Sequence, residues 1–308
     1  MQLFKLTDDP IVKRLRWVMI GMIIFGMINT LSGQPGSYWI HPETAIRGDG
    51  LSIYNETNRT FEFFLGMGWL TYLIAKTVFI LGVFWAVSII PKRPALIIIF
   101  SIIIGNYFDL TNWLAVRWHL FGLSGLAISS FVLGMVIVFT AFPILSQSTI
   151  QGIKALRWLM LIVIAIDVFN TLLGQPTGFW LHPETVNEAN PVAHFFLIHG
   201  WYAFVIYNII YSLGIILLIS SLSRRWALIC TFCFIFAHFI ASSTWLFYRW
   251  RLGFETPVIY GAVLSVIIVQ LVFFNREKTR DGDFLSTELT ADDKNDLCPG
   301  KFEFIKCV

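Results

Sequence analysis

A motif that combines histidine with glutamate occurs twice, as His41-Pro-Glu43-Thr and His182-Pro-Glu184-Thr. Imidazole and carboxylate groups bind zinc and other divalent metals, so these four side chains are weak candidates for a metal site if the two copies meet. The local alternative is a helix start, with proline at the first helical position and glutamate in the first turn. A short interfacial helix explains most of the motif, and its duplication indicates inheritance rather than chemistry.

Ionisable side chains inside long apolar runs are the stronger functional candidates: Lys76, Asp109, Asp167, His199 and His238. A charge at membrane depth is costly, so such residues tend to pair or to line a polar cavity. We expect Lys76 to couple with Asp109. Two interpretations of the whole set stay open, a path for protons or ions and a group of buried bridges that only hold helices together.

A further charged set lies at the ends of the apolar runs, on the side of the two motifs: Glu56, Arg117, Glu188 and Arg249. One arginine and one glutamate fall in each half of the chain, which predicts a clamp that holds an outer loop onto the helices. The glutamates of the two motifs are the alternative acceptors. We interpret this outer clamp as structural.

These candidates sit in a sequence that repeats itself. Residues 29–35 read Asn-Thr-Leu-Ser-Gly-Gln-Pro, and residues 170–176 read Asn-Thr-Leu-Leu-Gly-Gln-Pro. The match extends through both His-Pro-Glu-Thr motifs and into the later apolar runs, so two halves with one ancestor are predicted. We expect an N-terminal segment at 1–14, repeats at 15–146 and 147–275, and a polar, mostly disordered tail at 276–308.

The two halves differ at their ionisable positions. In the alignment of the repeats, Gly26 corresponds to Asp167 and Asn106 corresponds to His238. Lys76 and Asp109 likewise have uncharged counterparts in the second half. Half one therefore combines a lysine with an aspartate, and half two combines an aspartate with a histidine.

Composition places these residues in a membrane. The apolar fraction is 56% and the charged fraction is 13%, typical of a polytopic helical membrane protein. Continuous apolar runs predict eight transmembrane helices, near 15–33, 61–90, 94–117, 121–145, 155–173, 192–222, 226–248 and 256–275. The second and sixth are long, so we expect them to tilt or protrude.

The distribution of Lys and Arg predicts the orientation. Most of them flank one side of the predicted helices, so the positive-inside rule places both termini in the cytoplasm. Four helices in each half is an even number, so the repeats share one orientation about a pseudo-two-fold axis along the membrane normal. The plasma (inner) membrane is the expected location, and the net charge of +3 does not indicate a nucleic-acid partner.

These patterns favour a transporter-like or channel-like protein with a polar site between the repeats. The alternative is a non-catalytic membrane subunit or scaffold, whose partners would be other membrane subunits. A membrane enzyme with an outward-facing His/Glu site comes third. No cofactor is predicted, and the lipid bilayer is the one partner common to all three interpretations.

Overall fold

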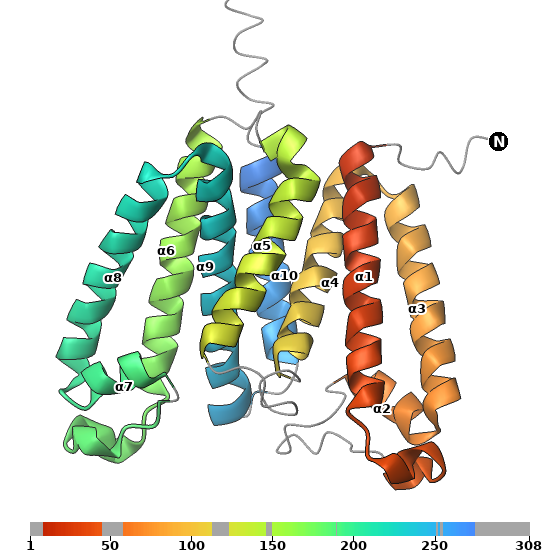
Figure 1. Cartoon of the computed structure of the whole chain (residues 1–308), viewed down its shortest axis with the longest axis horizontal. Helices are drawn as coiled ribbons and strands as arrows, with labels where there is room; N and C mark the ends of the chain where they lie inside the picture. Colours follow the sequence, from red (N-terminus) through yellow and green to blue (C-terminus); the bar gives the residue numbers. More distant parts are fainter. Residues whose placement is uncertain are drawn as a thin grey trace, which may run out of the picture.

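The computed structural model describes residues 9–44, 58–112, 123–145, 150–188, 190–250, 252 and 255–274. Every regular element within these ranges is helical, and no strand occurs among them. Six helices there are long and apolar enough to cross a membrane. They stand side by side in Figure 1. The chain therefore has the architecture of an α-helical, polytopic membrane protein.

The elements follow one another in the same order twice. The first series is α1 (Pro10–Ser32), η1 (Gly36–Trp39), η2 (Pro42–Thr44), α2 (Arg59–Gly66), α3 (Trp69–Ile89), α4 (Lys92–Asn112) and α5 (Leu123–Leu145). The second is α6 (Ile150–Leu173), η4 (Thr177–Trp180), η5 (Pro183–Thr185), α7 (Pro191–Leu197), α8 (Trp201–Ser221), α9 (Arg224–Thr244) with η6 (Trp245–Arg249), and α10 (Glu255–Val269) with η7 (Gln270–Phe274).

The second and sixth apolar runs are broken in two, so the prediction of single long helices was wrong. The breaks fall at Gly68 and Gly200, whose φ angles are 123° and 106°. Only glycine adopts this region of φ without strain. Each of these glycines separates a short helix from a longer one, α2 from α3 and α7 from α8. Asn58 and Asn190 cap the short helices α2 and α7, with side-chain oxygens that accept from the N–H groups of the first turn. Hydropathy is continuous across both breaks, which is why it could not reveal them.

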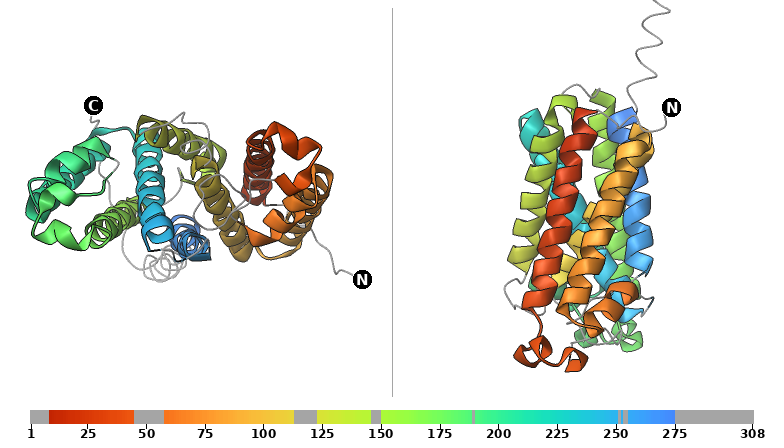
Figure 2. Two further views of the ribbon diagram at one scale, coloured as in Figure 1. Left: turned by 90° about the horizontal axis from the view of Figure 1, so that it is seen from below. Right: turned by 90° about the vertical axis from the view of Figure 1, so that its right-hand side faces the viewer.

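The helices form a central group with an outer group on either side (Figure 2). On one side α1 packs along α3 and α4, and on the other α6 packs along α8 and α9. In the centre the last helix of each series contacts the other series, since α5 packs on α9 and α10 packs on α4. The two series are therefore interlocked.

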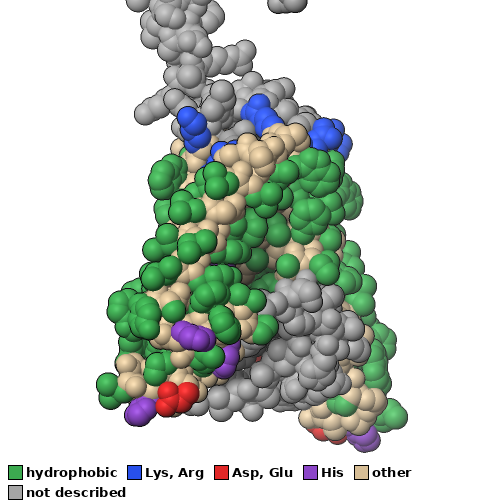
Figure 3. Space-filling view, turned by 60° about the vertical axis from the view of Figure 1, so that its left-hand side comes forward, with side chains coloured by type: hydrophobic (Ala, Val, Ile, Leu, Met, Phe, Trp, Pro, Cys, Tyr) green, Lys and Arg blue, Asp and Glu red, His purple; other side chains and the backbone are tan. Residues whose placement is uncertain are grey.

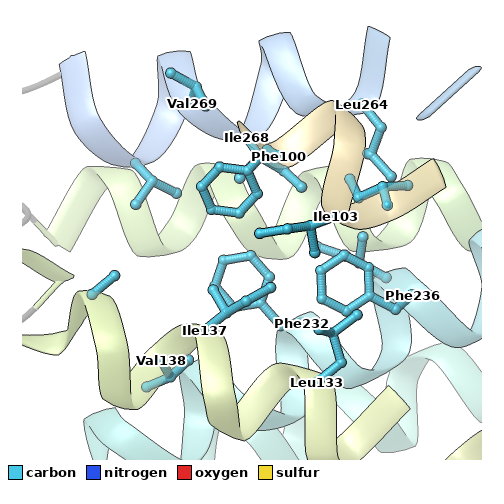
Figure 4. Close-up of a cluster of buried hydrophobic side chains, with 14 of the residues drawn as sticks. Phe100, Ile103, Leu133, Ile137, Val138, Phe232, Phe236, Leu264, Ile268 and Val269 are labelled. Atoms are coloured by element: carbon cyan, nitrogen blue, oxygen red, sulfur yellow. The ribbon is translucent and has the colours of Figure 1, made fainter. Parts of the chain in front are cut away.

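The contact between the central helices is hydrophobic. Figure 4 shows the side chains that fill it, which come from α4, α5, α9 and α10: Phe100, Ile103, Leu133, Ile137, Val138, Phe232, Phe236, Leu264, Ile268 and Val269. All of them are almost completely buried. We expected a polar site between the halves, but in the described residues drawn there the contact is made by apolar packing.

Charged side chains are segregated along the helix axes. Lys and Arg gather at one end of the molecule, and the His–Glu motifs lie at the other (Figure 3). Both α1 and α6 begin at the basic end, and both lead into their 3-10 segments at the opposite end (Figure 1).

Candidate functional site

A buried acid–base pair joins α6 to α9. Nδ1 of His238 lies 2.8 Å from Oδ2 of Asp167, and the two side chains are 15% and 13% exposed. Both residues lie well inside their helices, away from either end. An aspartate and a histidine at this distance share a proton, because the ring nitrogen donates when protonated and the carboxylate accepts. The two sequence candidates from the second half are thus brought together.

Two tyrosines extend this pair. The hydroxyl of Tyr211, on α8, lies 3.5 Å from Nε2 of His238, at the long limit of a hydrogen bond. Tyr260, on α10, has a second buried hydroxyl, which lies near Asp167 and Ser242. The sequence analysis missed both tyrosines, because nothing in an aromatic-rich helix distinguishes them from ordinary packing residues.

An unsatisfied polar atom marks the same cluster. Oδ1 of Asp167 is buried without a hydrogen-bond partner in the described part of the chain. Buried polar groups are nearly always paired in native proteins, so this atom calls for a chemical explanation. A bound water molecule, or a proton on the carboxyl group, would provide one.

A second polar contact fixes the register of α6 against α9. Nδ2 of Asn170 donates to Oγ of Ser242 over 2.7 Å, and both side chains are buried. Asn170 follows Asp167 by three residues and Ser242 follows His238 by four, so the two contacts lie one turn apart on the same helix faces. The amide–hydroxyl bond holds the acid and base opposite each other.

The equivalent place in the first series carries no charge. A Cβ atom added to Gly26 would lie 3.6 Å from Oδ1 of Asn106, so these two residues face each other across α1 and α4. Nδ2 of Asn106 donates to the carbonyl oxygen of Ile102 in its own helix, over 2.8 Å. The asymmetry seen in the sequence is thus located at one matching helix contact in each series.

Lys76 and Asp109 are both buried, with exposed fractions of 7% and 9%. Nζ of Lys76 lies 3.7 Å from the ring centre of Phe61 and 5.4 Å from that of Tyr72, so aromatic faces stabilise its charge. Phe61 belongs to the short helix α2, which the sequence had merged with the helix that carries Lys76. The coupling between Lys76 and Asp109 stays a prediction.

His199 was predicted to be buried, but it lies on the surface of the described structure. It is exposed just beyond the end of α7, and Nδ1 lies 2.7 Å from the carbonyl oxygen of Phe195. The break at Gly200 is the cause. With the helix interrupted there, the preceding turn does not continue into the helix that would have buried it.

The two His-Pro-Glu-Thr motifs form separate local pairs. Nδ1 of His41 lies 3.1 Å from Oε1 of Glu43, and the same 3.1 Å separates His182 from Glu184. The 3-10 helices that hold them lie beside α2 and α7, at opposite edges of the molecule (Figures 1 and 3). Among the described residues no group of three or more His, Cys, Asp or Glu side chains could hold a metal ion. The two copies therefore do not meet. The alternative interpretation, a helix start with proline at the first position and glutamate in the first turn, explains them.

In the second series each predicted member of the outer clamp has a described backbone partner, and their pairing with each other stays a prediction. Nε of Arg249 donates to the carbonyl oxygen of Gly174 over 2.7 Å, and Oε1 of Glu188 accepts from the N–H of Asn190 over 2.8 Å. Arg249 thus binds the C-terminal end of α6, where a cation is favoured. Glu56 and Arg117, the corresponding pair in the first half, lie outside the described residues.

Comparison of the chain with protein-family models, with curated proteins and with solved structures finds no match.

Proposed function

We propose that the chain is a transporter-like membrane protein that binds and releases a proton at the Asp167–His238 pair. The observation that carries the proposal is the burial of this pair inside α6 and α9, with Oδ1 of Asp167 left without a hydrogen-bond partner in the described structure. Ionisable residues at such depth are expensive, and they are typical of proton relays in pumps and transporters. Histidine changes charge near neutral pH, which suits it to repeated loading and release.

The three side chains Tyr211, His238 and Asp167 form a possible route for a proton from α8 through α9 to α6. Tyr211 approaches Nε2 of His238 from α8, and Asp167 receives Nδ1 from α6. When Nε2 takes up a proton, Nδ1 can release its own proton to the carboxylate of Asp167. The imidazole thereby transfers a proton from one ring nitrogen to the other. The cluster joins α6 and α8 to the central helices α9 and α10, which moves the proposed polar site from between the repeats into the second repeat.

We also propose the eight-helix arrangement, as two four-helix repeats in one orientation with both termini in the cytoplasm of the plasma membrane. Three features support it: the elements recur in order, both short helices end at a positive-φ glycine, and basic residues gather at one end. Cysteines introduced at Gly36 and Thr177 should react with an impermeant reagent from outside, and cysteines at Ser148 and Ser223 only from inside. Labelling of Gly36 and Thr177 from opposite sides would contradict the parallel repeat.

The proton-binding proposal is tested in liposomes. The purified chain is reconstituted with a pH-sensitive dye inside, and an imposed potential should drive proton entry in the wild type. Asp167→Asn and His238→Gln keep side-chain size and remove the titrating group, so we expect the flux to vanish in both. Asn106→Ala is the matched control, because it alters the corresponding contact of the first series and leaves Asp167, His238 and Asn170 in place. Equal flux in wild type and Asp167→Asn would reject the proposal.

A membrane subunit or scaffold is the second candidate, and the apolar central contact favours it. Interlocked helices with a hydrophobic centre give a rigid body without a path through the middle. On this model the protein is inert in liposomes and leaves native membranes in mild detergent together with other membrane subunits in fixed ratio. Purification as a single species that conducts protons would reject it.

A further inference from the structure

An arginine and a serine meet at equivalent places in both helix series, at the basic end of the molecule. Nη1 of Arg16, on α1, donates to Oγ of Ser88 near the end of α3. Nη1 of Arg157, on α6, donates over 3.2 Å to Oγ of Ser220 near the end of α8. The shared Leu-Arg-Trp sequence around both arginines shows that the positions correspond.

Among the described residues neither arginine forms an ion pair with a carboxylate. Arg16 is only 7% exposed, and its Nε atom, like that of Arg157, is buried without a hydrogen-bond partner there. The ring centre of Phe84 lies 4.7 Å from Cζ of Arg16 and offsets part of its charge. The nearby carboxylate of Asp9 is already bound to Lys92 and to the first turn of α1. A guanidinium carries five N–H donors, so one serine hydroxyl leaves each arginine with donors that an anion could use.

Neighbouring residues locate each arginine at the depth of the lipid headgroups. Trp17 and Trp158, the next residues along the chain, are 63% and 68% exposed. Tryptophan gathers at the membrane–water interface, because its ring is apolar and its N–H is polar. One turn before each arginine is an exposed lysine, Lys13 or Lys154. Each site thus presents a lysine, a partly satisfied arginine and an interfacial tryptophan on one helix.

We propose that each series binds the phosphate of an anionic phospholipid at this place, one lipid at Arg16 and one at Arg157. A guanidinium donates two parallel hydrogen bonds to phosphate oxygens, and the exposed lysine adds a second positive charge. Basic pockets between helices at the cytoplasmic side are a recognised class of lipid headgroup site. The proposal is independent of the proton site, which lies deeper in the membrane. It assigns a lipid-binding role to residues that would otherwise only hold α1 to α3 and α6 to α8.

The test uses the full-length purified chain and soluble short-chain lipids. Native mass spectrometry in detergent should show up to two bound molecules of dioctanoyl phosphatidylglycerol and fewer of dioctanoyl phosphatidylcholine. Arg16→Gln and Arg157→Gln should each lower the lipid affinity of the altered site about fivefold, because one basic residue near an anionic headgroup contributes about 1 kcal/mol. At a limiting lipid concentration each single variant should then retain one of the two bound molecules. The double variant should bind neither. Arg249→Gln loses the same charge at the opposite end and should bind as the wild type does.

The remaining arms separate this proposal from its alternatives. Arg16→Lys keeps the charge and loses the paired donors, so an intermediate affinity is expected. Inorganic phosphate at millimolar concentration should not displace the lipid; if it binds equally well, the site recognises free phosphate and the lipid proposal fails. Equal binding of both lipids, or unchanged binding in the double variant, would show that the arginines only tie helices together. If Arg16→Gln does not fold, the Arg157→Gln variant and the wild-type lipid comparison decide the question.

Discussion

At the contact between α1 and α4 a glycine faces an asparagine, whereas at the equivalent contact between α6 and α9 an aspartate faces a histidine. The surrounding structure is closely matched. Both series have a capped short helix, a glycine with positive φ, a local His–Glu pair and an Arg–Ser hydrogen bond. Because these features occur in both series, they account for the fold that the two series have in common. A contact between helices that is uncharged in one series and an acid–base pair in the other is therefore the best place to look for a function that the halves do not share.

The largest expected effect comes from breaking the ionisable contact. His238→Ala removes the partner of Asp167 and leaves a carboxylate buried among apolar helices. Removal of one member of a buried ion pair typically costs about 3–5 kcal/mol. Asn106→Ala, the corresponding change in the first series, removes a neutral hydrogen bond and should cost about 1 kcal/mol. Unfolding of both variants in detergent, by thermal scan and by denaturant, measures the difference.

The same contact offers a stricter control. The double variant Asp167→Gly with His238→Asn installs the residues of the first series in the second. It leaves no buried charge, so we expect it to recover most of the stability that His238→Ala loses, while proton flux stays absent. A double variant as unstable as His238→Ala would show that the surroundings have also diverged, and that the two contacts are not interchangeable.

The second effect tests what the two series have in common. Gly68→Ala and Gly200→Ala force a side chain into a backbone region that only glycine occupies freely, at a cost of about 1–3 kcal/mol each. At Gly200 the new Cβ would also lie 2.8 Å from the ring of Tyr202, whereas at Gly68 the nearest atom, in Pro42, is 3.5 Å away. We expect both variants to lose thermal stability, and Gly200→Ala to lose more. Gly82→Ala and Gly214→Ala, with open space around them, are the matched controls.

Sequence reasoning was most successful where composition or duplication carried the information. Apolar runs predicted membrane helices, and the alignment of the two halves drew attention to Asp167 and His238, which the structure brings together. It failed where a single backbone angle decided the outcome. The φ angle of Gly200 exposes His199, and no hydropathy pattern encodes that angle. Contacts between separate helices, such as that of Tyr211 with His238, depend on helix packing that periodicity alone does not specify.

A smaller effect is expected at the end of α6. Arg249→Gln removes the guanidinium that donates to Gly174 O, and a hydrogen bond from a charged donor contributes about 1.5–3 kcal/mol. Because this site is only partly buried, we expect the lower end of that range. Glu188→Gln keeps an oxygen that can still accept from the N–H of Asn190, so its effect should be smaller. If both variants lose the same stability, the two residues act as the pair that the sequence predicted.

The smallest expected effect lies at the basic end, where the first series has an ion pair whose aspartate is replaced by isoleucine in the second. Oδ2 of Asp9 lies 2.8 Å from Nζ of Lys92, and the residue equivalent to Asp9 in the second series is Ile150. Burial raises the pKa of Asp9, but the bonds from Lys92 and from the N–H groups of Ile11 and Val12 outweigh it, so the pKa lies below its ordinary value of 3.8.

A carboxyl group with a lowered pKa stabilises the folded state above its ordinary pKa, and this contribution is lost as the pH falls through the folded-state value. Both side chains are partly exposed, so the contribution of the pair should be under about 1 kcal/mol.

Lys92→Met should therefore lower the unfolding temperature slightly at pH 7. The difference from the wild type should shrink as the pH is lowered below 3.8, where the carboxyl becomes protonated in both. Arg224→Met, at the position of the second series that corresponds to Lys92, is the matched control and should show no such convergence through the start of α6, because the residue that corresponds to Asp9 there is Ile150. A difference for Lys92→Met that stays constant from pH 7 to pH 3 would mean that the lysine stabilises the helix end through its stem rather than through Asp9.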